Sequence, residues 1–363
     1  MRSMTILILT LLLNIATLEF SHAFKLDPYS NFETESRAFE KGARSKLFEL
    51  EPIHETLTLK AIAAAQIKED YKTDVFLQEI ITGVRWNDDP LNMSMHRPAD
   101  WYASYTDSCD GSEEIDPDWD LLYRTHCGDM QFLHAMASSK KESAGQTKER
   151  ILMWLEFTFK IASGQIDKDW RFRSMGKYLE NKSALLFKEL LTNNGLTREE
   201  WQPEWMFALK CDRSFSLTAM IFRWRLTELS CADKNNVSTE EHIQNIALGS
   251  LIHVLQDSFS GSHVLRVNPA RVGVSKVTGV GKVVQFGNYA MQTKDSHNNA
   301  DLKYLEDDHT EGFDLTEITA RTIELVVQQR SDKRERWEEA KQLFENLFEL
   351  VDPITPPGDI GYR

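Results

Sequence analysis

The chain has 363 residues, and its 56 acidic residues outnumber its 42 basic residues, which gives a net charge of −14 with the histidines neutral. This length is enough for one large helical domain or two small ones. The acidic balance argues against broad electrostatic binding to nucleic acid or to anionic lipid, because both are negatively charged. It places no restriction on a neutral, zwitterionic lipid.

Residues 1–23 have the pattern of a secretory signal peptide. Arg2 gives a short positive start, an apolar run follows over residues 6–15, and Ser21-His-Ala23 fits the small-x-small pattern before a cleavage site. The apolar run is too short to span a bilayer stably, and no other segment has the length and hydropathy of a membrane span. The sequence therefore predicts a secreted chain with a mature N-terminal arm over residues 24–52 and one helical domain over residues 53–363.

The first two helices expected in this domain each have a polar residue beside them. His54 opens an alanine-rich helix over residues 55–65. A second helix, over residues 76–81, leads into a turn that places Asp88 and Asp89 before a proline. The structural alternatives are an exposed histidine at a helix start and ordinary turn chemistry for the paired Asp residues.

Residues 91–124 form a long irregular segment rich in aromatic residues, and long loops in compact domains are often functional. Exposed rings there could contact lipid or surround a choline group; the alternative is that they pack the loop against the domain. His126 and His134 follow, eight residues apart, and both can face one site if the segment between them is helical.

The four cysteines are an even number, which in a secreted chain is compatible with two disulfides. The sequence allows three pairings, and we favour Cys109–Cys127 with Cys211–Cys231 because these close the shortest loops. Four free thiols are the alternative. Since no two cysteines have the Cys-x-x-Cys spacing, zinc ligation by cysteine is not expected.

The rest of the domain has a helical pattern, so the predicted class is all-α. Apolar residues recur at helical spacing over residues 147–162. Further helices are expected over residues 183–192, 216–230, 314–326 and 333–351. Residues 265–296 have no strong period and could include a short hairpin.

The segment over residues 243–263 predicts a buried helix that carries polar side chains. It is apolar nearly all round, yet His253 and Asp257 lie four residues apart and therefore share one face. Gly249 and Ser250 fall on the same strip, so another element can approach that face closely. A buried imidazole and carboxylate need pairing or a metal ion.

Four further residues add to this pair. Gly261 is expected to end the helix, so that His263 can turn back toward the same site. A second pair of the same spacing, His297 with Asp301, follows downstream. A His–Asp hydrogen bond in the core is the alternative for one such pair, but two pairs with an extra histidine favour a metal cluster. Histidine with carboxylate, without clustered thiols, suits a catalytic zinc site more than a closed structural one.

These residues give the chain a resemblance to a known family. The stretch Ala247-Leu-Gly-Ser-Leu-Ile-His253-x-x-x-Asp257, with His263 six positions on and then His297-x-x-x-Asp301, resembles the zinc-dependent phospholipase C and S1/P1 nuclease superfamily. The stretch Thr125-His-Cys-Gly-Asp-Met-Gln-Phe-Leu-His-Ala-Met-Ala137 is most similar to its bacterial phospholipases C, of the Pseudomonas and Legionella type. We judge the resemblance to cover roughly residues 50 to 310.

The resemblance implies a multi-helix bundle with two or three zinc ions in a cleft. It implies that Asp257 bridges two ions and that Asp88, with Asp89 in reserve, positions or deprotonates the attacking water. The family's mature chain begins with a Trp that binds zinc, whereas cleavage here gives Phe24, so the terminal ligand stays open. The implied ligand sets are His253, Asp257, Asp88 and His126 or His134; then His263, His297 and Asp301; then His54 with Asp257.

The function expected from this resemblance is that of a secreted, monomeric zinc phospholipase C that meets a membrane surface transiently. It would cleave the glycerol–phosphate bond of a phospholipid, phosphatidylcholine above all, and release diacylglycerol and a phosphorylated head group. A zinc-dependent single-strand nuclease or other phosphodiesterase is the second alternative, and the acidic charge and the 125–137 stretch favour lipid over nucleic acid. The third is a secreted, non-enzymatic metal-binding relative.

Overall fold

A computed structural model of the protein describes residues 53–90, 121–192, 203–207, 239–267, 280–292 and 315–360. The predicted signal peptide, the N-terminal arm and the expected helix over residues 216–230 lie outside these residues. Five predicted site or disulfide residues also lie outside them, namely Cys109, Cys211, Cys231, His297 and Asp301.

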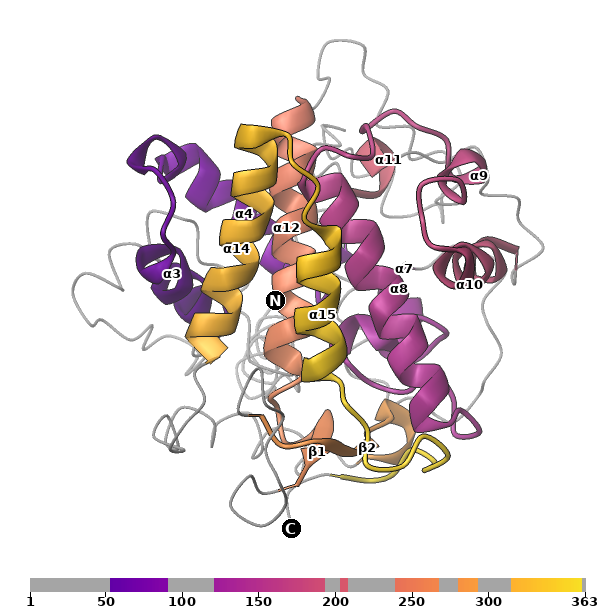
Figure 1. The fold of residues 1–363 in the computed structure, drawn as a ribbon. Helices are drawn as coiled ribbons and strands as arrows, with labels where there is room; N and C mark the ends of the chain where they lie inside the picture. The colour runs from indigo at the N-terminus through magenta and orange to yellow at the C-terminus, as the bar shows by residue number, and fades with distance from the viewer. Residues whose placement is uncertain are drawn as a thin grey trace, which may run out of the picture.

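The helix α12 (Glu240–Asp257) runs through the centre of the described structure, and the other long helices surround it (Figure 1). Its most extensive contacts are with α4 (Asp74–Trp86) and α8 (Ala144–Ala162), and it also packs against α14 (Leu315–Asp332). Every residue from position 245 to position 257 is buried. The prediction of a buried central helix is therefore confirmed.

This central helix ends at Asp257, four residues before the glycine that was expected to end it. The residue after it, Ser258, donates its backbone N–H to the carbonyl of Val254 and its hydroxyl to the carbonyl of Leu255. These bonds satisfy carbonyl groups that the end of a helix leaves without partners. A serine cap therefore replaces the predicted glycine end.

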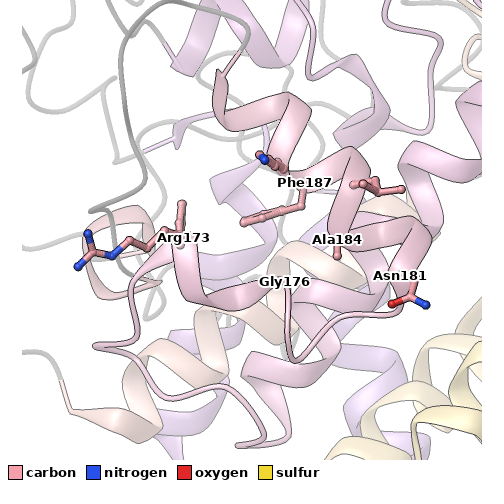
Figure 2. A pocket seen from close by; sticks show the side chains of 8 residues that line it. Arg173, Gly176, Asn181, Ala184 and Phe187 are labelled. Carbon is pink, nitrogen blue, oxygen red and sulfur yellow. The ribbon is translucent and has the colours of Figure 1, made fainter.

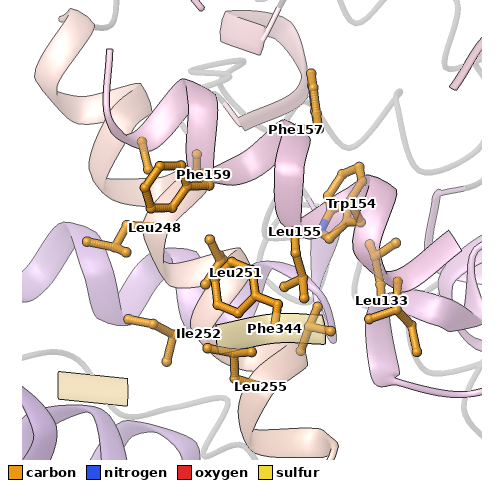
Figure 3. Close-up of a cluster of buried hydrophobic side chains, with 14 of the residues drawn as sticks. Leu133, Trp154, Leu155, Phe157, Phe159, Leu248, Leu251, Ile252, Leu255 and Phe344 are labelled. Carbon is orange, nitrogen blue, oxygen red and sulfur yellow. The ribbon is translucent and has the colours of Figure 1, made fainter. Parts of the chain in front are cut away.

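The main hydrophobic core lies where α12 meets α8 and α15 (Trp337–Leu347), as Figure 3 shows. Leucine and isoleucine side chains of α12 meet aromatic side chains of the other two helices. Burying large apolar side chains is the main favourable term in folding, so this core fixes the position of α12 in the bundle. The labelled core residues include Trp154, Phe157, Phe159, Leu248, Leu251, Ile252, Leu255 and Phe344.

Two glycines let α4 and α12 cross at very short range. A Cβ atom at Gly249 would overlap the carbonyl oxygen of Ile80 and the backbone of Gly83. A Cβ atom at Gly83 would in turn overlap the backbone of Ile246 on α12. This confirms that another element approaches the polar strip of α12 closely, and it brings the backbone of α4 within reach of His253.

Shorter elements complete the described structure. The helix α3 (Ile53–Ala64) packs mainly against α14. The strands β1 (Val264–Arg266) and β2 (Val283–Phe286) form an antiparallel hairpin, which confirms the short hairpin expected in this region. The remaining elements are η1 (Glu69–Tyr71), α7 (Leu121–His126), η3 (Gln131–His134), α9 (Phe172–Met175), α10 (Asn181–Thr192), α11 (Pro203–Phe207) and η5 (Tyr289–Met291).

Arg266 ties the hairpin to the ends of two helices. Its guanidinium donates hydrogen bonds to the carbonyls of Ser258, just after α12, and of Leu347, the last residue of α15. It also donates to the carbonyl of Gly281, just before β2. The hairpin, and the segment that follows β2, are thereby held at the carboxyl end of α12.

The described part of the chain is mostly helical with little sheet, which agrees with the predicted all-α class. The finer prediction of a phospholipase C or nuclease-like bundle stays a prediction. Among the described helices, none combines the length and hydropathy required to cross a membrane.

Candidate metal centre

His253 occupies the middle of the site, and its ring orientation is set by the close helix crossing. Its Nδ1 atom lies 2.7 Å from the carbonyl oxygen of Val84 on α4. A carbonyl can only accept, so Nδ1 carries the ring proton and donates it, which leaves a lone pair on Nε2. Burial lowers the pKa of His253 to about 3, so the imidazole is neutral at pH 7.

Asp257, one turn further along α12, lies among four imidazole rings. Its Oδ2 is 2.9 Å from Nε2 of His253, 2.9 Å from Nδ1 of His134 and 3.5 Å from Nδ1 of His263. Its Oδ1 is 3.3 Å from Nε2 of His54. Desolvation opposes ionisation of this buried carboxyl, but its electrostatic interactions with His253 and His263 and its hydrogen bond with His134 hold its pKa well below the ordinary value.

His54, at the start of α3, is oriented by the residue that precedes Asp257. Its Nδ1 lies 2.6 Å from Oε1 of Gln256, which accepts the ring proton, so Nε2 again faces the site with a lone pair. The amide NH₂ of Gln256 donates to the hydroxyl of Thr58 at 2.9 Å, which fixes the direction of the amide. The ring of His54 stacks on that of His253 with 4.1 Å between the ring centres.

Asp88 faces this group from the turn after α4. Its Oδ1 lies 3.6 Å from Nδ1 of His134, 3.8 Å from Nε2 of His253 and 3.9 Å from Nε2 of His126. The neighbouring Asn87 holds the turn in place, because its amide donates to the carbonyl of Leu133 and its carbonyl accepts from the hydroxyl of Ser250.

The ligand atoms fall into three groups whose members lie within 4.8 Å of one another. One group joins the ends of α3, α4 and α12, a second joins the α4 turn to α7 and η3, and a third joins η3 to α12. The groups overlap, because each shares at least one residue with another. They are His54, Asp88 and His253; Asp88, His126 and His134; and His134, His253 and Asp257.

The protonation of this cluster fits a bound cation. The Nε2 lone pair of His253 faces an ionised oxygen of Asp257 at 2.9 Å, and two acceptors at that distance repel. Nδ1 of His134 lies near both His253 Nε2 and Asp257 Oδ2. A single proton on this nitrogen cannot form a linear hydrogen bond to each of them, so it does not relieve the repulsion. Within the described residues, Nε2 of His134 and Oδ1 of Asp257 form no hydrogen bond, and every ion-pair partner of Asp257 is a histidine.

A buried carboxylate without a cationic partner is costly, and neutral imidazole nitrogens with carboxylate oxygens are the donor set that a divalent metal ion takes. The ring N–H groups of His253 and His54 donate to a carbonyl and to an amide oxygen, as the ring N–H of a metal-binding histidine usually does. These buried His and Asp groups can therefore hold a metal ion.

Seven of the nine predicted metal residues lie in the described part of the chain, and the structure brings all seven together. His263 does turn back, and its Nδ1 lies 3.5 Å from Asp257. His126 and His134 were the alternatives for one metal ligand. His134 is wholly buried and forms a hydrogen bond with Asp257, whereas His126 lies at the edge of the cluster near Asp88. Asp88, rather than Asp89, belongs to the metal-binding groups of the described residues.

The residues that orient this cluster were not identified from the sequence. Gln256 carried a signal, because it is a polar residue inside an apolar helix and stands directly before Asp257. Asn87 likewise stands directly before Asp88. The carbonyl of Val84 has no sequence signal at all, since any residue supplies a backbone carbonyl. Its role follows from the crossing of α4 and α12.

Cys127 is disulfide-bonded. The other three cysteines lie outside the described residues, so the pairing of Cys109 with Cys127 and of Cys211 with Cys231 stays a prediction.

The pocket in Figure 2 is a different kind of site. It has a volume of about 550 Å³ and lies between α9 and α10, with Phe172, Leu185 and Phe187 in its lining and Arg173 and Lys188 beside them. Its described lining residues include no histidine, cysteine or carboxylate, so they do not add to the groups that could hold a metal ion. Among the described residues, those groups gather near the carboxyl end of α12.

Comparisons of the chain with protein-family models, with curated proteins and with solved structures each find no match. The function is therefore inferred from the residues of the cluster and their geometry.

Proposed function

We propose that this protein is a secreted, zinc-dependent phosphodiester hydrolase that acts on phospholipids as a phospholipase C. The observation that carries the proposal is the buried Asp257 surrounded by four imidazole rings, two of which direct their ring protons away from it. Several imidazoles with carboxylates, and no thiol among them, favour zinc over magnesium or calcium, which prefer oxygen ligands.

A zinc ion held by these residues would act as a Lewis acid that lowers the pKa of a coordinated water and stabilises negative charge on a phosphoryl oxygen. The two oxygens of Asp257 face different neighbours, Oδ1 toward His54 and Oδ2 toward His134 and His253. Both oxygens of Asp257 would therefore be available to hold the metal. We assign to Asp88 Oδ1 the proton that leaves the attacking water, since this oxygen lies at the side of the cluster where His126 approaches solvent.

The choice of a phospholipid follows from charge and from the resemblance of the 125–137 stretch to bacterial phospholipases C. A net charge of −14 disfavours a nucleic acid, whose phosphates attract basic surfaces. A zwitterionic lipid such as phosphatidylcholine meets no such penalty. The reaction would add water across the bond between phosphorus and the glycerol oxygen, giving diacylglycerol and phosphocholine. We further propose that the enzyme is a monomer and meets the membrane only during turnover.

The test is head-group release from phosphatidylcholine vesicles by the full-length mature protein, measured with added zinc and again with a zinc chelator. We expect phosphocholine release that the chelator abolishes and zinc restores. A matched control is His242→Gln, because His242 lies on the same helix but outside the cluster. Cleavage of single-stranded DNA instead of lipid would replace this proposal with a nuclease. Tight zinc binding without cleavage of either substrate would indicate a non-enzymatic metal-binding protein.

A further inference from the structure

The solvent boundary of the metal cluster lies at His126 and Tyr289. The side chains of His54, His134, His253, Asp257 and His263 are fully buried, whereas that of His126 is 13% exposed. Tyr289, in η5, is partly exposed as well. Among the cluster residues and Tyr289, these two are the ones that water reaches, so the side on which they lie offers a substrate a route to the cluster.

Tyr289 contacts three histidines of the site at nearly equal distances. Its ring centre is 5.8 Å from that of His126, 5.8 Å from that of His134 and 5.9 Å from that of His263. These histidines come from α7, η3 and the turn after α12, so the tyrosine ring touches three separate walls of the cluster. A side chain that only filled space in the helix bundle would not need to contact all three histidines.

The backbone around Tyr289 is fixed to the same walls. Its N–H donates to Oε1 of Gln131 at 3.1 Å, and the amide of Asn288 donates to that oxygen and to the carbonyl of Ala137. The N–H of Gly287 donates to the carbonyl of His263 at 2.7 Å. The turn after β2 is thus tied to both His134 and His263, so Tyr289 keeps a set position relative to the cluster.

We propose that Tyr289 is a substrate-binding residue of this site, whose ring lines the entrance and whose hydroxyl donates a hydrogen bond to a phosphoryl oxygen of the bound diester. This inference rests on the proposed function and names a residue that the resemblance does not assign. A phenol hydroxyl is an uncharged hydrogen-bond donor, so it adds no charge beside the metal ligands. Hydrogen bonds from a fixed donor to an anionic oxygen are among the stronger ones in proteins.

The test compares wild-type protein with Tyr289→Phe, which keeps the ring and removes the donor. Both proteins are loaded with zinc, their zinc content is measured, and binding of inorganic phosphate is followed by isothermal titration calorimetry. We expect equal zinc content and phosphate binding weakened about 10-fold in the variant, since a hydrogen bond to a charged group contributes on that order. Tyr178→Phe is the matched control, because Tyr178 stacks on Trp170 and contacts none of the cluster histidines.

Each outcome bears on the inference. Unchanged phosphate affinity in Tyr289→Phe would overturn it, and so would loss of zinc from that variant, because the tyrosine would then serve only to hold the ligands. A wild-type protein that hydrolyses phosphatidylcholine while Tyr289→Phe has the same kcat and KM would leave the proposed function standing and remove only this inference. A wild-type protein that binds phosphate through Tyr289 but cleaves no diester would uphold the contact and overturn the proposed function.

Discussion

The helix α12 carries two sets of histidine and carboxylate contacts, and they differ in how their charges are balanced. Near its amino end, Nδ1 of His242 lies 2.8 Å from Glu79 on α4, and Asn245 donates to the other oxygen of Glu79. Arg330 on α14 donates to Asn245 and brings a permanent positive charge close by. At its carboxyl end, the ion-pair partners of Asp257 among the described residues are all histidines.

The difference indicates which of the two sets can hold a metal ion. At the amino end, desolvation opposes ionisation of Glu79, but hydrogen bonds from His242 and Asn245 and the charge of Arg330 outweigh it and lower the pKa of the carboxyl. Its negative charge is balanced within the protein. At the carboxyl end the imidazole of His253, 2.9 Å from Asp257, is kept neutral by burial and so does not balance the charge of Asp257 as Arg330 helps to balance that of Glu79. The first set is therefore balanced within the protein, whereas the second set can hold a metal ion.

Removing the carboxylate charge at each end of α12 should produce the largest difference between the two sets. We expect Asp257→Asn to bind zinc more than about 100-fold more weakly, a larger loss than the 10–100-fold typical of residues that only orient ligands, and to lose hydrolysis. Glu79→Gln should keep its zinc and lose about 1 kcal/mol of stability, the contribution of an ordinary hydrogen bond. Metal content after dialysis and thermal unfolding measure the two effects. Full zinc retention by Asp257→Asn would contradict the assignment of the site.

The crossing of α4 and α12 should be the next most sensitive feature. Gly249→Ala places a methyl group where the backbone of Ile80 and Gly83 already lies, so we expect a loss of about 3 kcal/mol in the free energy of unfolding, the upper range for overpacking. It should also weaken zinc binding, because separation of the helices lengthens the bond from His253 to Val84. Denaturant unfolding tests this. The control is Gly261→Ala, whose new methyl group meets no atom within 4 Å and should change stability by less than about 0.5 kcal/mol.

A smaller effect is expected from the residue that orients His54. Gln256→Ala removes the acceptor of the His54 ring proton, so it should weaken zinc binding by about 10- to 100-fold without unfolding the protein. Gln244→Ala, on the same helix but beside Glu240, should leave zinc affinity unchanged. Competition with a chromogenic chelator gives both affinities. Equal affinities in the two variants would mean that the ring of His54 needs no such support.

The most gradual effect is on the pH dependence of the metal-free protein. The pKa of His253 is about 3 in the folded state against an ordinary 6.5, so between these values the unfolded chain binds a proton that the folded chain does not. Stability is therefore fully present above about pH 6.5 and falls as the pH decreases, by up to about 1.4 kcal/mol per pH unit. Urea unfolding at pH 7 and pH 5 measures the slope. His253→Gln should flatten it, and an unchanged slope would show that another group is responsible.

The sequence by itself determined the buried central helix and the polar pair on it. The four-residue spacing of His253 and Asp257 fixes them on one helical face whatever surrounds it, and an apolar helix around them requires burial. That is why α12 could be predicted, whereas the participation of His54 and Asp88 was expected from the family resemblance and the return of His263 from a glycine at position 261. His297 and Asp301 lie in the segment over residues 293–314, which is outside the described residues, as is the segment over residues 91–120. The predicted roles of these two residues as metal ligands are therefore untested.

Only the tertiary structure decided how the ligands are oriented and which histidine is central. His126 and His134 have similar local sequence signals, but packing of η3 against α12 buries His134 and leaves His126 at the edge. The ring protons of His253 and His54 are set by Val84 and Gln256, partners 169 and 202 residues away in the chain. Such contacts leave no periodic trace in a sequence, because they arise where separate elements meet and depend on the distance between them.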